Sequence, residues 1–199
     1  MAQQELSRRT VLKSLGMGAA VGSVLRVIPA EAAEYAHHMI EQEKAATPNG
    51  AYTPKYFDAH GYKTLQALCE TILPADADAA GAIEAGAPEF IDLLTSENTE
   101  YQLRLGGGLK WLDATCTQRY GKAWVDCAAK EQAEALDLIA YKKNADADAN
   151  MGEPLLFFRL LRNMTADGFF TSKIGIKYLG YKGNTYLPEF PGCPPVPGV

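Results

Sequence analysis

The chain has 199 residues, of which 47% are hydrophobic and 22% charged, and a formal net charge of -5. This composition excludes a disordered chain and a collagen-like repeat, and the length is that of one domain of ordinary size. No uninterrupted apolar run reaches the roughly 20 residues of a membrane-spanning helix. The acidic balance argues against nucleic acid as a partner, because binding it requires a basic surface.

The first 33 residues contain the parts of an export signal in the expected order. Arg8 and Arg9 stand in a basic segment, and an uncharged stretch of twelve residues follows at 14–25. This stretch is too short to span a bilayer but typical of the apolar part of a signal, and three glycines make it only mildly apolar. Small residues at 30–33 supply a cleavage site after Ala32, with the bond after Ala33 as a nearby alternative.

Consecutive arginines before a weakly apolar, glycine-containing stretch resemble a twin-arginine signal, which exports proteins that are already folded. We therefore expect residues 1–33 to be a twin-arginine signal peptide, with Arg8 and Arg9 engaging the translocase and the protein exported to the periplasm. The alternative is a basic amphipathic helix at the N-terminus of the final protein. Residues 1–33 contain four basic and two acidic side chains, so the remainder carries a net charge of -7. That charge suits neither phosphate backbones nor anionic lipid surfaces.

Residues 34–57 are polar and contain a turn signal at 47–50. We interpret them as a linker or extended segment that leaves room for a short helix near residues 36–45. The first clear helix begins after Asp58, a good N-cap, and ends at Leu73, because Pro74 cannot continue it. Its apolar residues recur at spacings of three and four, which predicts one buried stripe: Tyr62, Leu65, Leu68, Cys69 and Ile72.

Further helices are predicted over 88–94, from a cap at Ser96 or Asn98 onward, over 128–142 and over 154–164. The run Gly106-Gly107-Gly108 falls inside the second of these, where it indicates a kink or a close contact with another backbone. No stretch shows the sustained alternation of a strand. The sequence therefore predicts the all-α class, with an irregular helical domain and long loops over residues 58–164.

The C-terminal segment, residues 165–199, is rich in aromatic residues and glycine, and five of its last twelve residues are proline. Proline excludes helix and central strand, so we expect an extended arm. Exposed aromatic side chains are unfavourable in water, so the arm should pack either on its own domain or on a partner protein. The residues alone leave both possibilities open.

The cysteines form an even set, and export would permit disulfides. They are Cys69, Cys116, Cys127 and Cys193. Four cysteines allow three connectivities. Cys116 and Cys127 are eleven positions apart across a helix break at Gly121, and Cys193 is placed to reach Cys69 or another chain. Free buried thiols are the alternative.

Motifs for catalysis and metal binding are absent from the sequence. The three histidines, His37, His38 and His60, lack a metal-binding spacing. The acidic loops at 76–81 and 146–150 resemble the start of calcium loops but lack the bidentate acid at the twelfth position. No nucleophile, nucleotide or metal motif occurs, so we expect no cofactor in this chain. An enzyme using Asp58, His60 and Glu70 is a minor alternative without an orienting motif.

Several short motifs together resemble the gluconate 2-dehydrogenase subunit 3 family. One is the helix sequence LQALCETILP at residues 65–74. The others lie in the C-terminal segment: Ala166-Asp167-Gly168, Gly175-Ile176, Leu179-Gly180-Tyr181, Gly183-Asn184-Thr185 and Pro191-Gly192-Cys193. With the twin-arginine signal, the resemblance covers nearly the whole chain.

The resemblance implies a non-catalytic small subunit of a sugar or sugar-acid dehydrogenase complex. In that family the large subunit is a flavoprotein of the glucose-methanol-choline type that holds FAD, and a cytochrome c subunit with haem c commonly accepts the electrons. The small subunit carries the export signal and helps the large subunit to mature. The complex would be associated with the inner membrane through another subunit.

On this reading the C-terminal arm buries against the flavoprotein. The candidate interface residues are Phe169, Phe170, Tyr178, Tyr181, Asn184, Tyr186 and Phe190. Cys193 would be in a position to fix the tail covalently. The main alternative is an independent exported binding or chaperone module with no permanent flavoprotein partner.

Overall fold

A computed structural model describes residues 28–77, 79–181 and 183. In this part of the chain the regular structure is helical and contains no strand, which confirms the all-α class. In chain order the elements are α2 (Ala30–Ala46), α3 (Ala59–Ile72), α4 (Ala87–Ser96), α5 (Thr99–Tyr101), the π-helix η1 (Gln102–Gly106), α6 (Gly107–Tyr120), the 3-10 helix η2 (Trp124–Asp126), α7 (Ala129–Ala140), α8 (Lys142–Ala147), the 3-10 helix η3 (Ala149–Met151), α9 (Gly152–Phe170) and α10 (Lys173–Tyr178).

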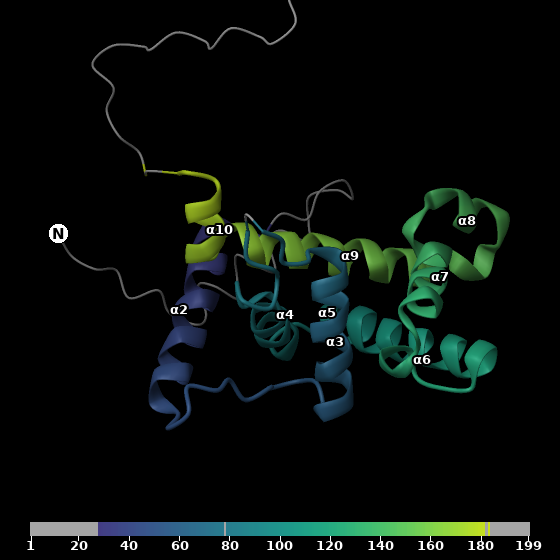
Figure 1. The fold of residues 1–199 in the computed structure, drawn as a ribbon, viewed down its shortest axis with the longest axis horizontal. Coiled ribbons are helices and arrows are strands. Elements are labelled where there is room, and N and C mark those ends of the chain that lie inside the picture. Colours follow the sequence, from purple (N-terminus) through teal and green to yellow (C-terminus); the bar gives the residue numbers. More distant parts are fainter. Residues whose placement is uncertain (1–27, 78, 182, 184–199) are drawn as a thin grey trace, which may run out of the picture.

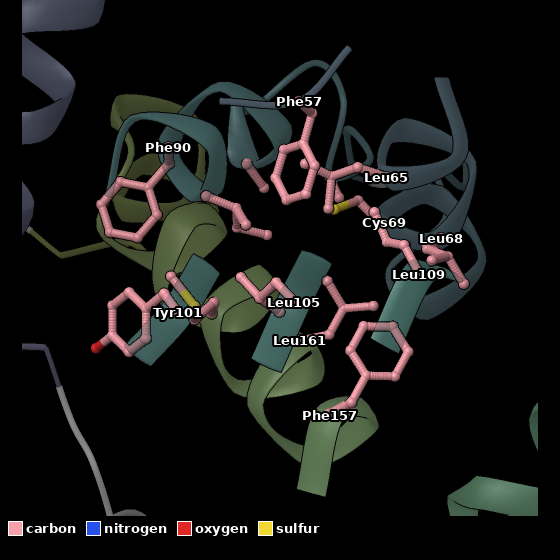
Figure 2. Close-up of a cluster of buried hydrophobic side chains, with 14 of the residues drawn as sticks. Phe57, Leu65, Leu68, Cys69, Phe90, Tyr101, Leu105, Leu109, Phe157 and Leu161 are labelled. Carbon is pink, nitrogen blue, oxygen red and sulfur yellow. The ribbon is translucent and has the colours of Figure 1, made fainter. Parts of the chain in front are cut away.

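Helix α9 is the central element of the domain (Figure 1). Helices α3, α4, α6 and α7 all pack against it, and it contributes Phe157, Leu161 and Met164 to the buried core. Figure 2 shows this core, in which Phe157 and Leu161 approach side chains from several helices. The others labelled there are Phe57, Leu65, Leu68, Cys69, Phe90, Tyr101, Leu105 and Leu109. Burial of this apolar surface is the main stabilising contribution to the fold.

The boundaries of helix α3 agree with the prediction to within one residue. The Asp58 carboxylate accepts a hydrogen bond from the Gly61 backbone N–H at 2.7 Å, so it caps the helix as expected. The helix ends at Ile72, two residues before Pro74. The predicted stripe faces the core, with Leu65, Leu68 and Cys69 buried and Tyr62 and Ile72 partly buried against it.

The glycine run is explained by a close approach of side chains rather than of another backbone. Helix α6 begins at Gly107, and Gly108 lies directly against Phe157 of α9, so that a Cβ atom at position 108 would overlap the aromatic ring. A Cβ atom at Gly106 would come within 2.6 Å of the Tyr56 hydroxyl oxygen. A Cβ atom at Gly107 would meet no atom within 4 Å.

Gly108→Ala will therefore destabilise the domain by roughly 2 to 3 kcal/mol, because the new methyl group must displace a core aromatic ring. Gly107→Ala is the matched control, because a methyl group at this position meets no other atom and alanine favours a helix more than glycine does. The free energy of unfolding should rise by about 0.5 to 1 kcal/mol. Urea unfolding of both variants measures the difference. Equal stabilities would contradict the packing of α6 on α9.

Helix α2 corrects the interpretation of residues 34–57 as a linker. The helix is longer than the short one expected near 36–45, and it begins inside the segment assigned to the signal peptide. Ala32, Ala33, Ala36 and Ile40 are buried, because the small side chains let α2 lie close to α4. The boundary drawn at residue 33 therefore falls within a helix that belongs to the domain.

The start of the C-terminal segment is also helical rather than extended. Helix α9 continues to Phe170, and α10 follows after Ser172, whose side chain accepts a hydrogen bond from the Gly175 N–H. The Ser172 cap turns the chain back on α9, and the two helices pack together. The proline-rich end of the predicted arm lies outside the described residues.

Candidate functional site

A groove of the described surface lies between α2, residues 84–86 and the end of α9 with α10. Its volume is about 1170 Å³. Its lining combines apolar side chains with five charged groups, those of Glu34, Glu41, Lys44, Glu84 and Lys173. Lys173 Nζ lies 2.7 Å from Glu41 Oε1, so this ion pair links α10 to α2 across the groove.

Large apolar side chains are exposed at this end of the domain, and we call them the α10 patch. Its members are Phe170, Ile176, Tyr178, Leu179 and Tyr181. All but Tyr178 line the groove, and the Tyr178 ring contacts Phe169, with ring centroids 6.2 Å apart. These large side chains gather within twelve positions at one end of the domain, and α10 lies at the end of α9 opposite α8 (Figure 1). A group of exposed apolar side chains beside a groove is typical of a protein-binding surface.

His37, which lines the groove, fixes α2 against α4 and the end of α9. Its ring stacks on Phe90 of α4, with ring centroids 5.0 Å apart, and its Nε2 lies 2.9 Å from Thr171 Oγ1. The Thr171 hydroxyl donates to the Asp167 carbonyl, so it accepts from the His37 N–H. Burial lowers the pKa of His37, while the nearby Glu41 carboxylate opposes this shift. The neutral imidazole is therefore the form that suits the folded protein.

Acidification should loosen this contact. Because the pKa of His37 in the folded protein lies below its unfolded value, the stabilisation is present above the ordinary histidine value of 6.5 and is lost as the pH falls through the lowered pKa. His37→Gln retains a hydrogen-bond donor without a titrating ring, so its stability should fall less between pH 7.5 and 5. His38→Gln on the exposed side of α2 should behave as wild type. Thermal unfolding at both pH values provides the comparison, and parallel losses in all three proteins would contradict the assignment.

The predicted interface residues divide into three groups. Phe169 is a core residue, 1% exposed, so its assignment to a partner interface is wrong. Phe170, Tyr178 and Tyr181 are exposed and belong to the α10 patch. Asn184, Tyr186 and Phe190 lie outside the described residues, as do Arg8 and Arg9.

Sequence reasoning missed Ile176 and Leu179, which complete the α10 patch. Both belong to the family motifs, and the motifs do not show whether a side chain is exposed. The signal that would have found them is Ser172 as an N-cap, because a helix starting there places 176 and 179 three positions apart, on the same face.

Three of the four cysteines are free, buried thiols, Cys69, Cys116 and Cys127. Cys69 lies in the core, 3.5 Å from the Thr165 hydroxyl, and burial raises its pKa to about 12. Burial also raises the pKa of Cys116 to about 12, with a smaller contribution from the adjacent Cys127 thiol. The structure therefore brings Cys116 and Cys127 together as expected, and a disulfide between them after export stays a prediction. Cys193 lies outside the described residues.

The three residues of the alternative catalytic group, Asp58, His60 and Glu70, each make a different local contact. Asp58 caps α3, and His60 Nε2 lies 2.7 Å from Asp113 Oδ2 on α6. Glu70 accepts a hydrogen bond from the Ala75 N–H near the opposite end of α3. Asp58 and Glu70 are twelve positions apart, about 18 Å along the helix axis. The three side chains form no common site.

The described residues contain no cluster of three or more His, Cys, Asp or Glu side chains able to hold a metal ion. Nor is any helix in the described ranges both long and apolar enough to cross a membrane. The groove with the α10 patch is therefore the feature of the described surface that most resembles a binding site.

Comparison with known families finds a match. Residues 59–192 match the family described as gluconate 2-dehydrogenase subunit 3, which is well over half of the chain. The matched range includes α3 to α10 and therefore the α10 patch. No match was found among curated proteins or among solved structures. The extent of the family match confirms the resemblance seen in the sequence motifs, and the chain belongs to the gluconate 2-dehydrogenase subunit 3 family.

Proposed function

We propose that this chain is the non-catalytic small subunit that exports and stabilises an FAD-dependent sugar or sugar-acid dehydrogenase. The family is by name a subunit of a dehydrogenase, which makes the chain an accessory subunit of such a complex. The proposal adds that the twin-arginine signal at Arg8 and Arg9 carries a folded flavoprotein of the glucose-methanol-choline type to the periplasm. FAD is held by that partner, and haem c by a cytochrome subunit that accepts the electrons.

The observation that carries the proposal is the α10 patch within the family-matched range. A subunit needs a surface that stays unfavourable in water until its partner covers it. Two tyrosines, a phenylalanine and two aliphatic side chains meet this requirement, and aromatic residues are enriched among those that dominate binding energy. The adjacent groove provides the concave surface into which the catalytic subunit docks.

The chemistry of the groove fits a large protein partner. Lys173 pairs with Glu41, and Lys44 Nζ lies 2.7 Å from Glu89 Oε1. Glu41, Lys44 and Lys173 line the groove beside the apolar side chains of the patch. Apolar side chains next to charged groups are typical of a protein interface.

Tyr178→Asp will weaken binding of the catalytic subunit by about tenfold or more, because a buried carboxylate replaces an aromatic side chain at the interface. Tyr141→Asp is the matched control. Tyr141 is 54% exposed and Tyr178 57%, but Tyr141 lies between α7 and α8 at the other end of the domain (Figure 1).

The binding measurement is co-purification of the flavoprotein with tagged small subunit, followed by flavin absorbance. Retained binding by Tyr141→Asp and lost binding by Tyr178→Asp support docking at the α10 patch. Loss of flavoprotein binding in both variants, or in neither, would show that the partner binds at another surface. Circular dichroism of each variant confirms that the helical domain is intact.

A further inference from the structure

The peptide bonds expected to be cut on removal of the signal lie inside a folded helix. Helix α2 starts at Ala30, and the N–H groups of Ala32 and Ala33 both donate to the Pro29 carbonyl, at 2.9 and 3.0 Å. Ala32 is 0% exposed and Ala33 1%. The small side chains next to the two bonds, Ala32 and Ala33, therefore face the core, whereas Ala30, the other small residue of the A-x-A pattern, is exposed.

The chain is held to the core on both sides of these bonds. On the N-terminal side Ile28 is buried, and its backbone N–H donates to the Asp167 carboxylate on α9. On the C-terminal side Ala36 and Ile40 are buried, and His37 is stacked on α4. The first turn of α2 is thus part of the domain rather than a flexible leader.

Proteases cut backbone that is exposed and free to leave its secondary structure. Cutting a buried helical turn requires local opening, and the rate then follows the small population of the open form. A cut after Ala32 would also create an ammonium group at Ala33, where the core offers a new charge little solvation. The positive end of the α2 dipole would add repulsion.

We propose that the folded subunit keeps its export signal, because its own helix α2 buries the bonds after Ala32 and Ala33. The inference rests on the proposed twin-arginine export, which delivers a chain that is already folded when it meets the peptidase. The exported subunit then retains residues 1–27, including Arg8 and Arg9, as a permanent N-terminal extension of the complex.

The first experiment determines the intact mass and N-terminal sequence of the small subunit purified with its partner from cells with an active twin-arginine system. The expected result is the full chain of 21.6 kDa. A chain that begins at Ala33 or Glu34 would overturn the inference while leaving export intact. Cell fractionation is read separately, so that a failure of export counts against the proposed function instead.

The second experiment works whether or not the chain is exported. Purified full-length protein is incubated with signal peptidase in detergent micelles, where the folded wild type should stay uncut. Ala36→Asp places a charge in the buried face of α2 and should expose the bonds to cleavage. Ala45→Asp makes the same change at an exposed position of α2 and should leave the protein resistant.

Cleavage of the wild type with its helical circular dichroism unchanged would overturn the inference. So would resistance of Ala36→Asp, because something other than burial would then protect the bonds. If Ala36→Asp does not accumulate, Asp167→Ala replaces it. That variant removes the acceptor of the Ile28 N–H and should loosen the start of α2.

Discussion

Replacing Arg8 and Arg9 with lysine will leave most of the dehydrogenase activity in the cytoplasm. The substitution keeps both positive charges but removes the planar guanidinium groups, whose fixed fork of donors lysine cannot reproduce. If this chain carries the only export signal of the complex, the catalytic subunit will be stranded with it. The measurement is dehydrogenase activity in periplasmic and cytoplasmic fractions of cells expressing the whole complex.

Arg26→Lys is the matched control for this experiment. It makes the same chemical change within the first 33 residues but outside the arginine pair. Periplasmic activity should be normal in this variant. Normal periplasmic activity in the Arg8→Lys, Arg9→Lys double variant would refute the escort role, since the flavoprotein would then reach the periplasm without this signal.

Asp92→Ala should cost about 4 kcal/mol of the free energy of unfolding. Asp92 is a fully buried residue of α4 whose carboxylate accepts four hydrogen bonds from the segment joining α2 to α3. The donors are the Tyr52 hydroxyl at 2.9 Å and the backbone N–H groups of Lys55, Tyr56 and Phe57 at 2.6, 3.1 and 3.0 Å. Without the carboxylate these donors lose their acceptor, at roughly 1 to 3 kcal/mol for each one left buried.

Asp92→Asn keeps one acceptor oxygen and should lose less stability than Asp92→Ala. Asp137→Ala on the exposed side of α7 controls for loss of an aspartate and should change stability by less than about 0.5 kcal/mol. Urea denaturation followed by circular dichroism compares the three. A small effect of Asp92→Ala would show that residues 52–57 are held by other contacts.

The sequence predicted those helices whose start and end signals are local. Asp58 and Pro74 mark the ends of α3, and its apolar spacing matches the buried face that the structure shows. The turn signal at 47–50 marks the end of α2, but its buried face carries no comparable signal, because three of its four buried residues are alanines in a polar segment. Their burial depends on the surface of α4, which lies about fifty positions further along the chain.

Contacts between residues far apart in the sequence also explain the other differences between prediction and structure. Gly108 is required by Phe157, and no pattern around position 108 reveals that contact. Phe169 and Phe170 are neighbours in the sequence, but successive helical residues point about 100° apart. One therefore enters the core and the other joins the α10 patch. An aromatic-rich segment indicated an interface, but only the helix direction shows which of its side chains can reach a partner.

Purification of the tagged small subunit from its own cells distinguishes an accessory subunit from an independent protein. We expect a yellow complex in which a larger polypeptide holds flavin and oxidises a sugar or sugar acid, while the separated small chain is colourless and inactive. A colourless small chain purified alone would favour an independent exported module. A lone small chain that bound flavin and oxidised sugar would contradict the account outright.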